Sequence, residues 1–403
     1  MSNANTSLSA ARKAKNDEFY TRIEDVEREM RHYEKHFEGK TVFLNCDDPS
    51  ESNFWRYFEL NFDRLGLRRL ISTHYDPEKP TYMQEIVRGD DLDGDGKHTG
   101  LDIRRRDLLG NGDFRSPEAM ALLDESDIVV TNPPFSLFRE YIAQLVEHNK
   151  DFIVIGNMNA ITYKEVWQYI QAGRVWLGSM PSFMAFRVPD DSEPRATRYW
   201  EDEEGKWRSL GNACWFTTLD HARRHEEIPL FRRYEDDPSA YPKYANYDAI
   251  EVSKVADIPA DYTVEREVTE DELSDITSRG FVVTVLDRPT DRPDSRSVRI
   301  ENPCMGVPIT FLGKHNPEQF EIVGYFVDGT EAERMGARRV PVLKAGKPSM
   351  SNGPVIGTQK LYDRILIRRV ISSSESRIRA WASRSPSSAS TTPSSSRSSG
   401  SPA

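Results

Sequence analysis

Four consecutive residues, Asn132, Pro133, Pro134 and Phe135, follow directly on an apolar run at 127–131 that is typical of a buried strand. Because proline lacks the backbone N–H and fixes φ, two prolines in succession end a strand and form a rigid, extended turn. In such a turn the carboxamide oxygen of Asn132 and the carbonyl of Pro133 could accept the two hydrogens of a planar amino group, while the Phe135 ring stacks on that plane. The alternative is a tight strand-to-helix turn with a buried phenylalanine, and the tetrapeptide alone leaves both open.

Alternating strand and helix patterns surround this tetrapeptide. Short apolar runs predict strands, and amphipathic patterns predict helices. The strands are expected at 41–46, 70–75, 127–131 and 152–157, and the helices at 25–37, 53–66, 117–123 and 137–148. Such alternation indicates an α/β fold with a doubly wound parallel sheet, which binds ligands outside the carboxyl ends of its strands. Two further runs, 175–180 and 213–219, predict closing strands, and a loop-rich stretch is expected before the helix at 117–123.

Composition limits the class of protein. The 403 residues carry 54 basic and 65 acidic side chains, a net charge of −11, and 37% of them are hydrophobic, which is sufficient for a core. No apolar run approaches the roughly 18 residues of a membrane span, and the N-terminus has no apolar segment of a secretory signal. The three cysteines are widely spaced and fit neither a disulfide framework nor a zinc site, so a cytoplasmic location and no bound metal are expected.

The net charge by itself argues against a nucleic-acid partner, since such proteins usually carry a basic surface. The charges are unevenly spread, however: acidic clusters occur at 89–96 and 201–204, and arginine pairs occur separately at 223–224 and 232–233. Acidic loops can therefore surround a basic cleft, and the sum of the charges does not decide the partner.

Eight sequence blocks in the same order resemble the EcoRI-type family of DNA adenine methyltransferases. They are KNDEFYT (15–21), NCDDP (45–49), GDFRS (112–116), SDIVVTNPPFSLFREY (126–141), NAITYKEV (159–166), YPKYANYDAI (241–250), MGVPITFL (305–312) and LYDRILIR (361–368). The resemblance implies a Rossmann-like, S-adenosylmethionine-dependent methyltransferase sheet with an irregular C-terminal target-recognition region. It also implies methyl transfer to the exocyclic amino group of adenine in duplex DNA. Because that group lies inside the base stack, the adenine must be flipped into the pocket.

The same resemblance assigns roles to individual residues. The turn expected to hold the flipped adenine is Asn132, Pro133, Pro134 and Phe135. The residues expected to bind the cofactor are Asp17, Glu18, Phe19, Tyr20, Asn45, Asp47, Asp48, Asp113 and Phe114. The glycine-rich loop usual after the first methyltransferase strand is absent, and Cys46–Pro49 takes its place. Helix capping and surface turns are the competing interpretation of the acidic residues.

Three parts are expected along the chain. Residues 1–220 would form the cofactor-binding and catalytic domain, with an N-terminal helical block at 13–40; residues 221–369 would form the target-recognition region. A serine-rich tail, 370–403, is predicted to be disordered. DNA contacts in the second part are expected from Arg223, Arg224, Lys243 and Tyr244, with internal ion pairs and tyrosine packing as the alternatives. Residues 263–302 look like an insertion without a functional interpretation.

Three weaker patterns are given structural interpretations. Acidic residues from Asp91 to Asp102 fit much of a calcium-loop template, but the last ligand is not glutamate, so a solvated acidic loop is expected. His221 and His225 lack the glutamate of a metalloprotease helix and are expected at the surface. Cys214 lies beside two aromatic residues and is expected in the core.

Two other function classes stay open. An NPP-aromatic turn also suits methylation of RNA or of a glutamine side chain, and a DNA-binding decoy without catalysis is a further alternative. The expected partner is double-stranded DNA, with no membrane, and the expected state is a monomer. A cognate restriction endonuclease in the same system, without a stable complex, is also expected.

Overall fold

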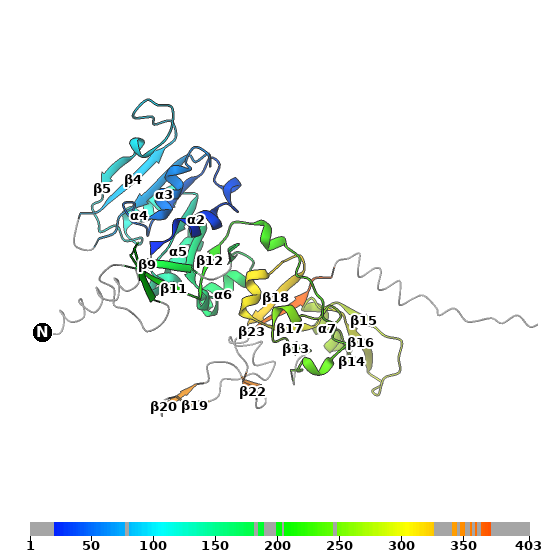
Figure 1. Ribbon diagram of the computed structural model, residues 1–403. Coiled ribbons are helices and arrows are strands. Elements are labelled where there is room, and N and C mark those ends of the chain that lie inside the picture. The colour runs from blue at the N-terminus through cyan, green and yellow to red at the C-terminus, as the bar shows by residue number, and fades with distance from the viewer. Residues whose placement is uncertain are drawn as a thin grey trace, which may run out of the picture.

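The computed structural model describes residues 20–76, 80–180, 184–188, 199–203, 205–244, 248–325, 341–344, 347–350, 355–356, 359–360 and 364–371. Of the predicted segments, 17–19 and the tail from 372 onward lie outside these ranges. Figure 1 shows a larger N-terminal part, coloured blue to green, beside a C-terminal part that contains the yellow strands. None of the helices in the described ranges is long and apolar enough to cross a membrane.

An eight-stranded sheet, in the order β5-β4-β3-β2-β6-β7-β12-β8, forms the centre of the N-terminal part. Its strands are β5 (Arg104–Asp107), β4 (Tyr82–Val87), β3 (Arg69–Thr73), β2 (Thr41–Leu44), β6 (Ile128–Thr131), β7 (Asp151–Asn157), β12 (Ala213–Thr217) and β8 (Trp176–Leu177). The four middle strands β3, β2, β6 and β7 are parallel, whereas β4 and β12 run antiparallel to both neighbours. The predicted α/β class and parallel sheet are therefore confirmed, and β8 and β12 are the two closing strands.

The antiparallel pair β4–β5 corrects the expectation of a loop-rich stretch before 117. Strand β5 consists of Arg104, Arg105, Arg106 and Asp107, all exposed, so it carries no hydrophobic signal. It pairs with β4 through the backbone, and the Arg105 guanidinium lies over the Tyr82 ring, 3.4 Å from its centroid; neither contact is visible in a hydrophobic pattern.

Two layers of helices cover the sheet. Helices α2 (Ile23–Met30) and α3 (Asn53–Leu60) share a core with Val42 and Leu44 of β2. Helices α4 (Pro117–Glu125), α5 (Phe138–Glu147) and α6 (Lys164–Gln171) share the other core with Phe43. Successive strand side chains point to opposite faces, and a sheet covered on both sides therefore has the continuous apolar runs seen in the sequence.

A small antiparallel sheet, β1-β9-β11-β10, lies next to this domain. Its strands are β1 (Tyr20–Thr21), β9 (Met184–Val188), β11 (Gly205–Leu210) and β10 (Tyr199–Asp202). Met184 and Phe186 are buried in the core shared with α2 and α3, so one face of this sheet packs on the domain.

The C-terminal part contains more regular structure than the sequence indicated. A four-stranded sheet is formed by β13 (Ala249–Glu251), β17 (Cys304–Pro308), β23 (Arg364–Arg369) and β18 (Phe320–Tyr325). The predicted insertion folds as β14 (Val264–Thr269), α7 (Glu270–Ser278), β15 (Val283–Val285) and β16 (Ser295–Ile300). Two short hairpins follow, β19 (Pro341–Lys344) with β20 (Lys347–Met350) and β21 (Val355–Ile356) with β22 (Gln359–Lys360).

Short 3-10 helices occur in both parts of the described chain. They are η1 (Glu34–His36), η2 (Gly100–Asp102), η3 (Phe135–Leu137), η4 (Met158–Thr162), η5 (Ala222–His225), η6 (Pro238–Ala240), η7 (Val255–Asp257) and η8 (Ile309–Lys314).

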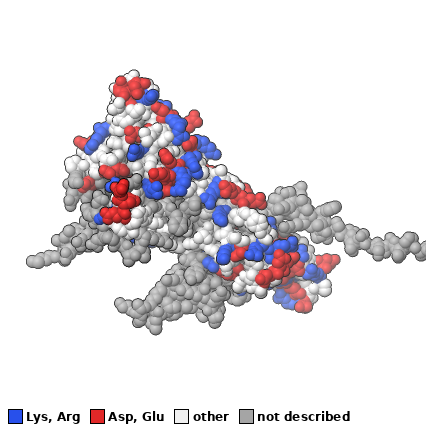
Figure 2. Space-filling model, in the orientation of Figure 1, with Lys and Arg blue, Asp and Glu red and all other residues white. Residues whose placement is uncertain are grey.

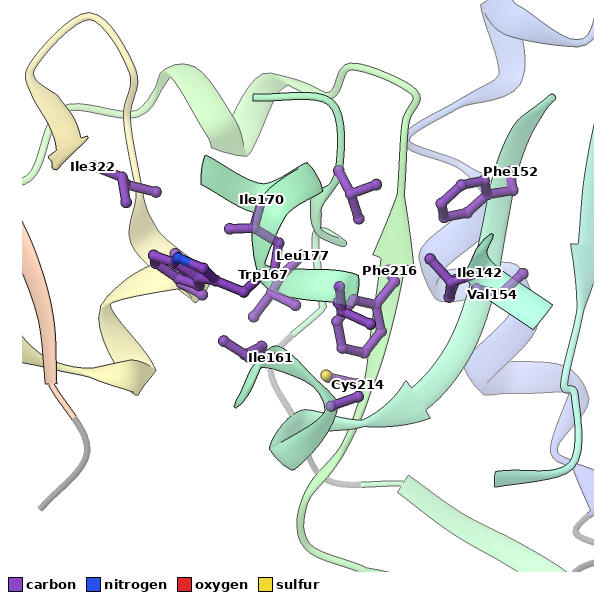
Figure 3. Close-up of a cluster of buried hydrophobic side chains, with 14 of the residues drawn as sticks. Ile142, Phe152, Val154, Ile161, Trp167, Ile170, Leu177, Cys214, Phe216 and Ile322 are labelled. Carbon is purple, nitrogen blue, oxygen red and sulfur yellow. The ribbon is translucent and has the colours of Figure 1, made fainter. Parts of the chain in front are cut away.

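One hydrophobic core joins the two parts. Figure 3 shows it extending from Phe152 on β7, past Phe216 on β12, to Trp167 on α6 and Ile322 on β18. The rings of Trp167 and Tyr325 lie 5.0 Å apart across the junction. Cys214 is buried in this core, as expected, and all three cysteines are free.

Candidate active site at the carboxyl edge of the sheet

The strand order places a binding crevice between the carboxyl ends of β2 and β6. The chain continues from β2 to its neighbour β3 on one side, and later returns to β6 on the other side. Ligands of open α/β sheets bind at such a switch point, because the loops diverge there. Asn45–Pro49 follow β2, and the tetrapeptide that begins at Asn132 follows β6. Two predicted segments thus meet at one place.

Asp47 connects these two segments. Its carboxylate accepts hydrogen bonds from the Thr131 hydroxyl and, at 3.3 Å, from the Asn132 backbone N–H. The hydroxyl of Ser52, the N-cap of α3, donates to the other oxygen at 3.1 Å. Burial raises the pKa of Asp47 to about 7, although these hydrogen bonds act in the opposite direction. The Asp47 carboxylate, in the loop after β2, therefore holds the first residue of the NPPF turn in place.

The NPPF turn is only partly exposed, and the carboxamide oxygen of its asparagine is covered. Pro133 is buried, whereas Asn132, Pro134 and Phe135 are half-buried. Helix η3 begins at Phe135 and leads directly into α5, whose first residue, Phe138, is buried. The core phenylalanine is thus Phe138, and the Phe135 ring remains partly open to solvent.

Asn45 lies deeper in the crevice, where α5 crosses the end of β2. The Tyr141 hydroxyl donates to Asn45 Oδ1, and both side chains are buried. Within the described ranges, the buried Asn45 Nδ2 has no hydrogen-bond acceptor. The amide nitrogen is thus a free donor at the carboxyl end of the first parallel strand of the chain.

Asp113 and Phe114 belong to a loop that contacts the same crevice. Phe114 is buried, and its ring meets Tyr141 edge-on at 5.0 Å. Asp113 pairs with Arg115 at 2.7 Å, and this hydrogen-bonded arginine lowers the pKa of the carboxyl group. Burial raises the pKa of the Cys46 thiol, with the Asp47 and Asp113 carboxylates adding to the effect. The 112–114 loop and the 45–48 loop are therefore neighbours.

Gly112 explains how that loop reaches the sheet. Its φ of +73° belongs to the left-handed region, and a Cβ there would lie 2.1 Å from the His74 carbonyl oxygen. Only glycine allows the loop to pack against the backbone at the end of β3.

Asp48 takes part in a turn and in a contact with β3. Its Oδ1 accepts hydrogen bonds from the backbone N–H and the hydroxyl of Ser50, at 3.0 and 2.8 Å. Its Oδ2 lies 2.9 Å from His74 Nδ1, and the His74 ring stacks on Tyr82. The competing interpretation of Asp48 as a turn residue is thus consistent with its contacts, and its expected cofactor role stays a prediction.

Sequence analysis missed the partners that organise the crevice: Ser52, His74, Thr131 and Tyr141. Thr131 adjoins the NPPF turn, so its position was a usable signal. Tyr141 follows Phe138 and Phe135 at helical spacing, but its contact with Asn45 spans 96 residues and carries no local pattern. Of the N-terminal cofactor block, only Tyr20 is described, in β1 opposite Arg187 of β9.

All four residues expected to contact DNA have internal partners, and the Lys243 ammonium lies 6.0 Å from the centroid of the Tyr234 ring. Arg223 donates to the Ser179 carbonyl, and the Arg224 guanidinium lies over Trp176, 3.8 Å from the ring centroid. Tyr244 is buried and donates to Glu251 at 2.5 Å. Lys243 is the exposed member of the four. These contacts match the alternative of internal pairing and packing.

Two other expectations can be compared with the structure. His221 is buried with its Nε2 3.0 Å from the Leu177 carbonyl oxygen, so the expectation of a surface position was wrong for it. His225 is exposed, as expected, and contacts Asp220 and Glu318.

The acidic loop resembles a calcium site only in part. One carboxylate oxygen from each of Asp91, Asp93 and Asp95 lies within 4.8 Å of the others, and all three residues are exposed. Asp102 instead accepts hydrogen bonds from the backbone N–H groups of Leu92 and Thr99, at 2.7 and 2.8 Å. The residue at the last ligand position therefore stabilises the loop.

Comparisons with known proteins agree with the earlier resemblance. Residues 7–271 and 300–370 match the model of the family described as adenine-specific methyltransferase EcoRI. The chain is 42% identical over 330 residues to Type II methyltransferase M.EcoRI of Escherichia coli. The aligned residues cover 80% of this chain and 89% of the relative. It is 34% identical over 317 residues to Type II methyltransferase M.MpnI of Mycoplasma pneumoniae, covering 78% of this chain and 83% of the relative. No solved structure matches the chain. The unmatched stretch between 271 and 300 lies inside the predicted insertion.

Proposed function

This chain belongs to the EcoRI family of adenine-specific methyltransferases, and from this premise we propose that the crevice between β2 and β6 is its active site. The enzyme is an S-adenosylmethionine-dependent DNA methyltransferase that modifies adenine in double-stranded DNA at specific sites. The observation that supports the location is the Asp47 carboxylate, which accepts hydrogen bonds from both Thr131 and Asn132 and so joins the loops of the two strands.

The NPPF turn acts on the adenine amino group. The Asn132 carboxamide oxygen and the Pro133 carbonyl accept its two hydrogens, and Phe135 stacks on the base. Such hydrogen bonds favour release of the nitrogen lone pair from conjugation, and holding the nitrogen in line with the methyl group supplies the rest of the acceleration. In the transfer the adenine nitrogen would bond to the methyl carbon, the electron pair of the broken carbon–sulfur bond would stay on sulfur, and the extra proton of the amino group would pass to solvent. The adenine reaches the turn by flipping out of the duplex.

The crevice residues fit the methyl donor. S-adenosylmethionine supplies a methyl group on a positively charged sulfur that is already activated for transfer. The free, buried Asn45 Nδ2 offers a donor for a polar group at the carboxyl end of β2. The Asp113 carboxylate and the Phe114 ring would take the adenine of the cofactor, and residues 17–20 and 47–48 would surround its remaining parts.

The proposal also covers the division of the chain into two parts, the oligomeric state and the partner. Residues 221–369 would recognise the target sequence, next to a catalytic part at 1–220. The enzyme would act as a monomer beside a cognate restriction endonuclease without forming a stable complex. The family match disfavours the other function classes, methylation of RNA or of glutamine side chains and a decoy role without catalysis.

The decisive experiment compares wild-type enzyme with Asn132→Ala. Incorporation of labelled methyl groups is measured into unmethylated duplex DNA, RNA and protein, with binding of S-adenosylmethionine followed by calorimetry. We expect transfer to adenine of duplex DNA by the wild type, and nearly complete loss in the variant with the cofactor affinity preserved. Normal incorporation by the variant would refute the role of the NPPF turn, and cofactor binding without wild-type transfer would favour the decoy.

A further inference from the structure

A groove of about 810 Å³ opens beside the candidate active site, between helix α3 and the sheet β1-β9-β11-β10. Its edge at Pro49–Asn53 is the turn that follows β2, and Ser52 in this turn donates to Asp47. None of the described residues expected to bind the cofactor lines the groove. The groove therefore adjoins the active site, and it also borders the expected cofactor residues, since Tyr20 lies opposite Arg187 in the β1–β9 register.

Three exposed arginines line the groove from opposite sides. Arg56 belongs to α3, Arg187 to β9, and Arg22 lies next to β1. Arg22 pairs with Glu24 at 3.3 Å. In the described ranges, neither Arg56 nor Arg187 forms an ion pair. Two guanidinium groups thus remain available for an anion.

Two acidic residues also belong to the groove. Glu51 and Glu59 also line it, but neither forms an ion pair with Arg56 or Arg187 among the described residues. The Glu59 carboxylate instead lies against the loop at Gly100, where an added Cβ would be 2.5 Å from Glu59 Oε1.

The sheet places its arginine beside two tryptophans. Trp207 lies directly opposite Arg187 in the β11–β9 register, and Trp200 lies opposite Trp207 in the β10–β11 register. The two indole rings stack with centroids 6.4 Å apart, and Trp200 is 41% exposed. Gly205 leaves room for the guanidinium, since a Cβ there would lie 2.9 Å from Arg187 Nε. This row combines cationic and flat aromatic side chains, which suits the backbone and sugars of a nucleic acid.

We propose that this groove binds the phosphate backbone of the DNA strand next to the target adenine. The proposal rests on the proposed function, because this groove would meet a phosphate backbone only if DNA is the substrate at the NPPF turn. Arginine suits the task, since its planar guanidinium donates two parallel hydrogen bonds to a phosphate. Figure 2 shows acidic and basic side chains intermixed on the face that it draws, so a local basic groove, rather than a broad basic surface, agrees with the net charge of −11.

The test uses Arg56→Gln, Arg187→Gln and the double variant of the full chain. The matched control is Arg174→Gln, an exposed arginine that follows α6, on the opposite side of the central sheet. Dissociation constants for duplex DNA are measured at several salt concentrations, with calorimetry of S-adenosylmethionine and thermal melting alongside. Each groove substitution should weaken binding to methylatable and to unrelated DNA by the same factor, and should reduce the log–log salt slope by about 1. The control should bind as the wild type does.

Wild-type salt slopes in both single variants would overturn the proposal. A loss of cofactor affinity with unchanged DNA affinity would also overturn it, and would assign the groove to the cofactor. Failure of the proposed function would be seen differently, as absence of methyl transfer to DNA by the wild-type enzyme itself.

Discussion

The Thr131 hydroxyl donates a hydrogen bond to the Asp47 carboxylate, across the boundary between β6 and β2. Thr131 is the last residue before the NPPF turn, and Asp47 belongs to the loop after β2. The same carboxylate accepts a hydrogen bond from the Asn132 N–H at 3.3 Å. The backbone at Asn132 is therefore positioned by a side chain of the neighbouring loop.

Replacing Thr131 by valine should disturb the turn while keeping the shape of the side chain. Loss of a hydrogen bond to a charged group should cost about 1.5–3 kcal/mol of the free energy of unfolding. Displacement of Asn132 should lower kcat by about 10- to 100-fold, because transfer depends on a near-attack geometry. Methyl-transfer kinetics and chemical unfolding measure the two effects.

Thr131→Ser should restore most of kcat, because serine keeps the hydroxyl. Thr284→Val is the matched control, since the Thr284 hydroxyl donates to Glu301 at 2.8 Å in the inserted region, away from the crevice. It should lose stability and retain kcat. Equal kcat in Thr131→Val and the wild type would show that the contact does not position the turn.

The buried Glu29 on α2 should make stability depend on pH. It accepts hydrogen bonds from Tyr33 and from the backbone N–H groups of Ser179 and Met180, and burial raises its pKa from 4.5 to about 7. The folded state then holds a proton that the unfolded state releases, so the stabilising contribution is complete below about pH 4.5 and is lost as the pH rises through about 7.

Urea unfolding across this pH range measures the effect. Glu29→Gln, which stays neutral, should flatten the decline of the free energy of unfolding with pH. A residual slope of the same sign should remain, because burial also raises the pKa of Asp47 to about 7. Identical slopes in variant and wild type would contradict a shifted Glu29.

Gly112→Ala should damage the loop that carries Asp113 and Phe114. The new Cβ would lie 2.1 Å from the His74 carbonyl oxygen, so the loop must move away from β3. Gly89→Ala is the control, because Gly89 has a similar positive φ of +91° but nothing within 4 Å of its Cβ position. The control should lose only about 1 kcal/mol from backbone strain.

Thermal melting and calorimetry with S-adenosylmethionine separate the two glycine variants. Gly112→Ala should melt at a lower temperature than the control and bind the cofactor more weakly. Unchanged cofactor affinity in a folded Gly112→Ala protein would argue against this loop as part of the cofactor site.

Calcium should have little effect on the acidic loop. Asp102, at the last ligand position, is already hydrogen-bonded to the backbone of Leu92 and Thr99, which leaves three exposed carboxylates. Such a site lacks the bidentate final ligand of a calcium loop. Addition of millimolar Ca²⁺ or of a chelator should leave the melting temperature unchanged, and a calcium-dependent increase that Asp93→Asn abolishes would contradict this expectation.

Much of the central domain was predictable from local sequence. The runs at 41–46, 127–131 and 152–157 became β2, β6 and β7, because strands buried on both faces must be continuously apolar. The amphipathic pattern of the helix expected at 25–37 marked a buried face, since Val26, Met30, Tyr33 and Phe37 are all buried, although the α-helix ends at Met30 and a 3-10 turn follows. The exposed edge strand β5 was missed, because its residues carry no apolar pattern.

The sequence by itself determined the family, the α/β sheet and the NPPF turn at the end of a buried strand, since each is marked by short blocks of neighbouring residues. Only the tertiary structure decided which side chains support that turn. Asp47 and Thr131 are 84 residues apart, and Asn45 and Tyr141 are 96 apart. The structure likewise gave Arg223, Arg224 and Tyr244 internal partners and brought Arg56 and Arg187 to one groove. The physical reason is that hydrogen bonding and charge pairing depend on distance in space. The order of the strands in the sheet sets that distance, whereas the spacing of residues along the chain does not.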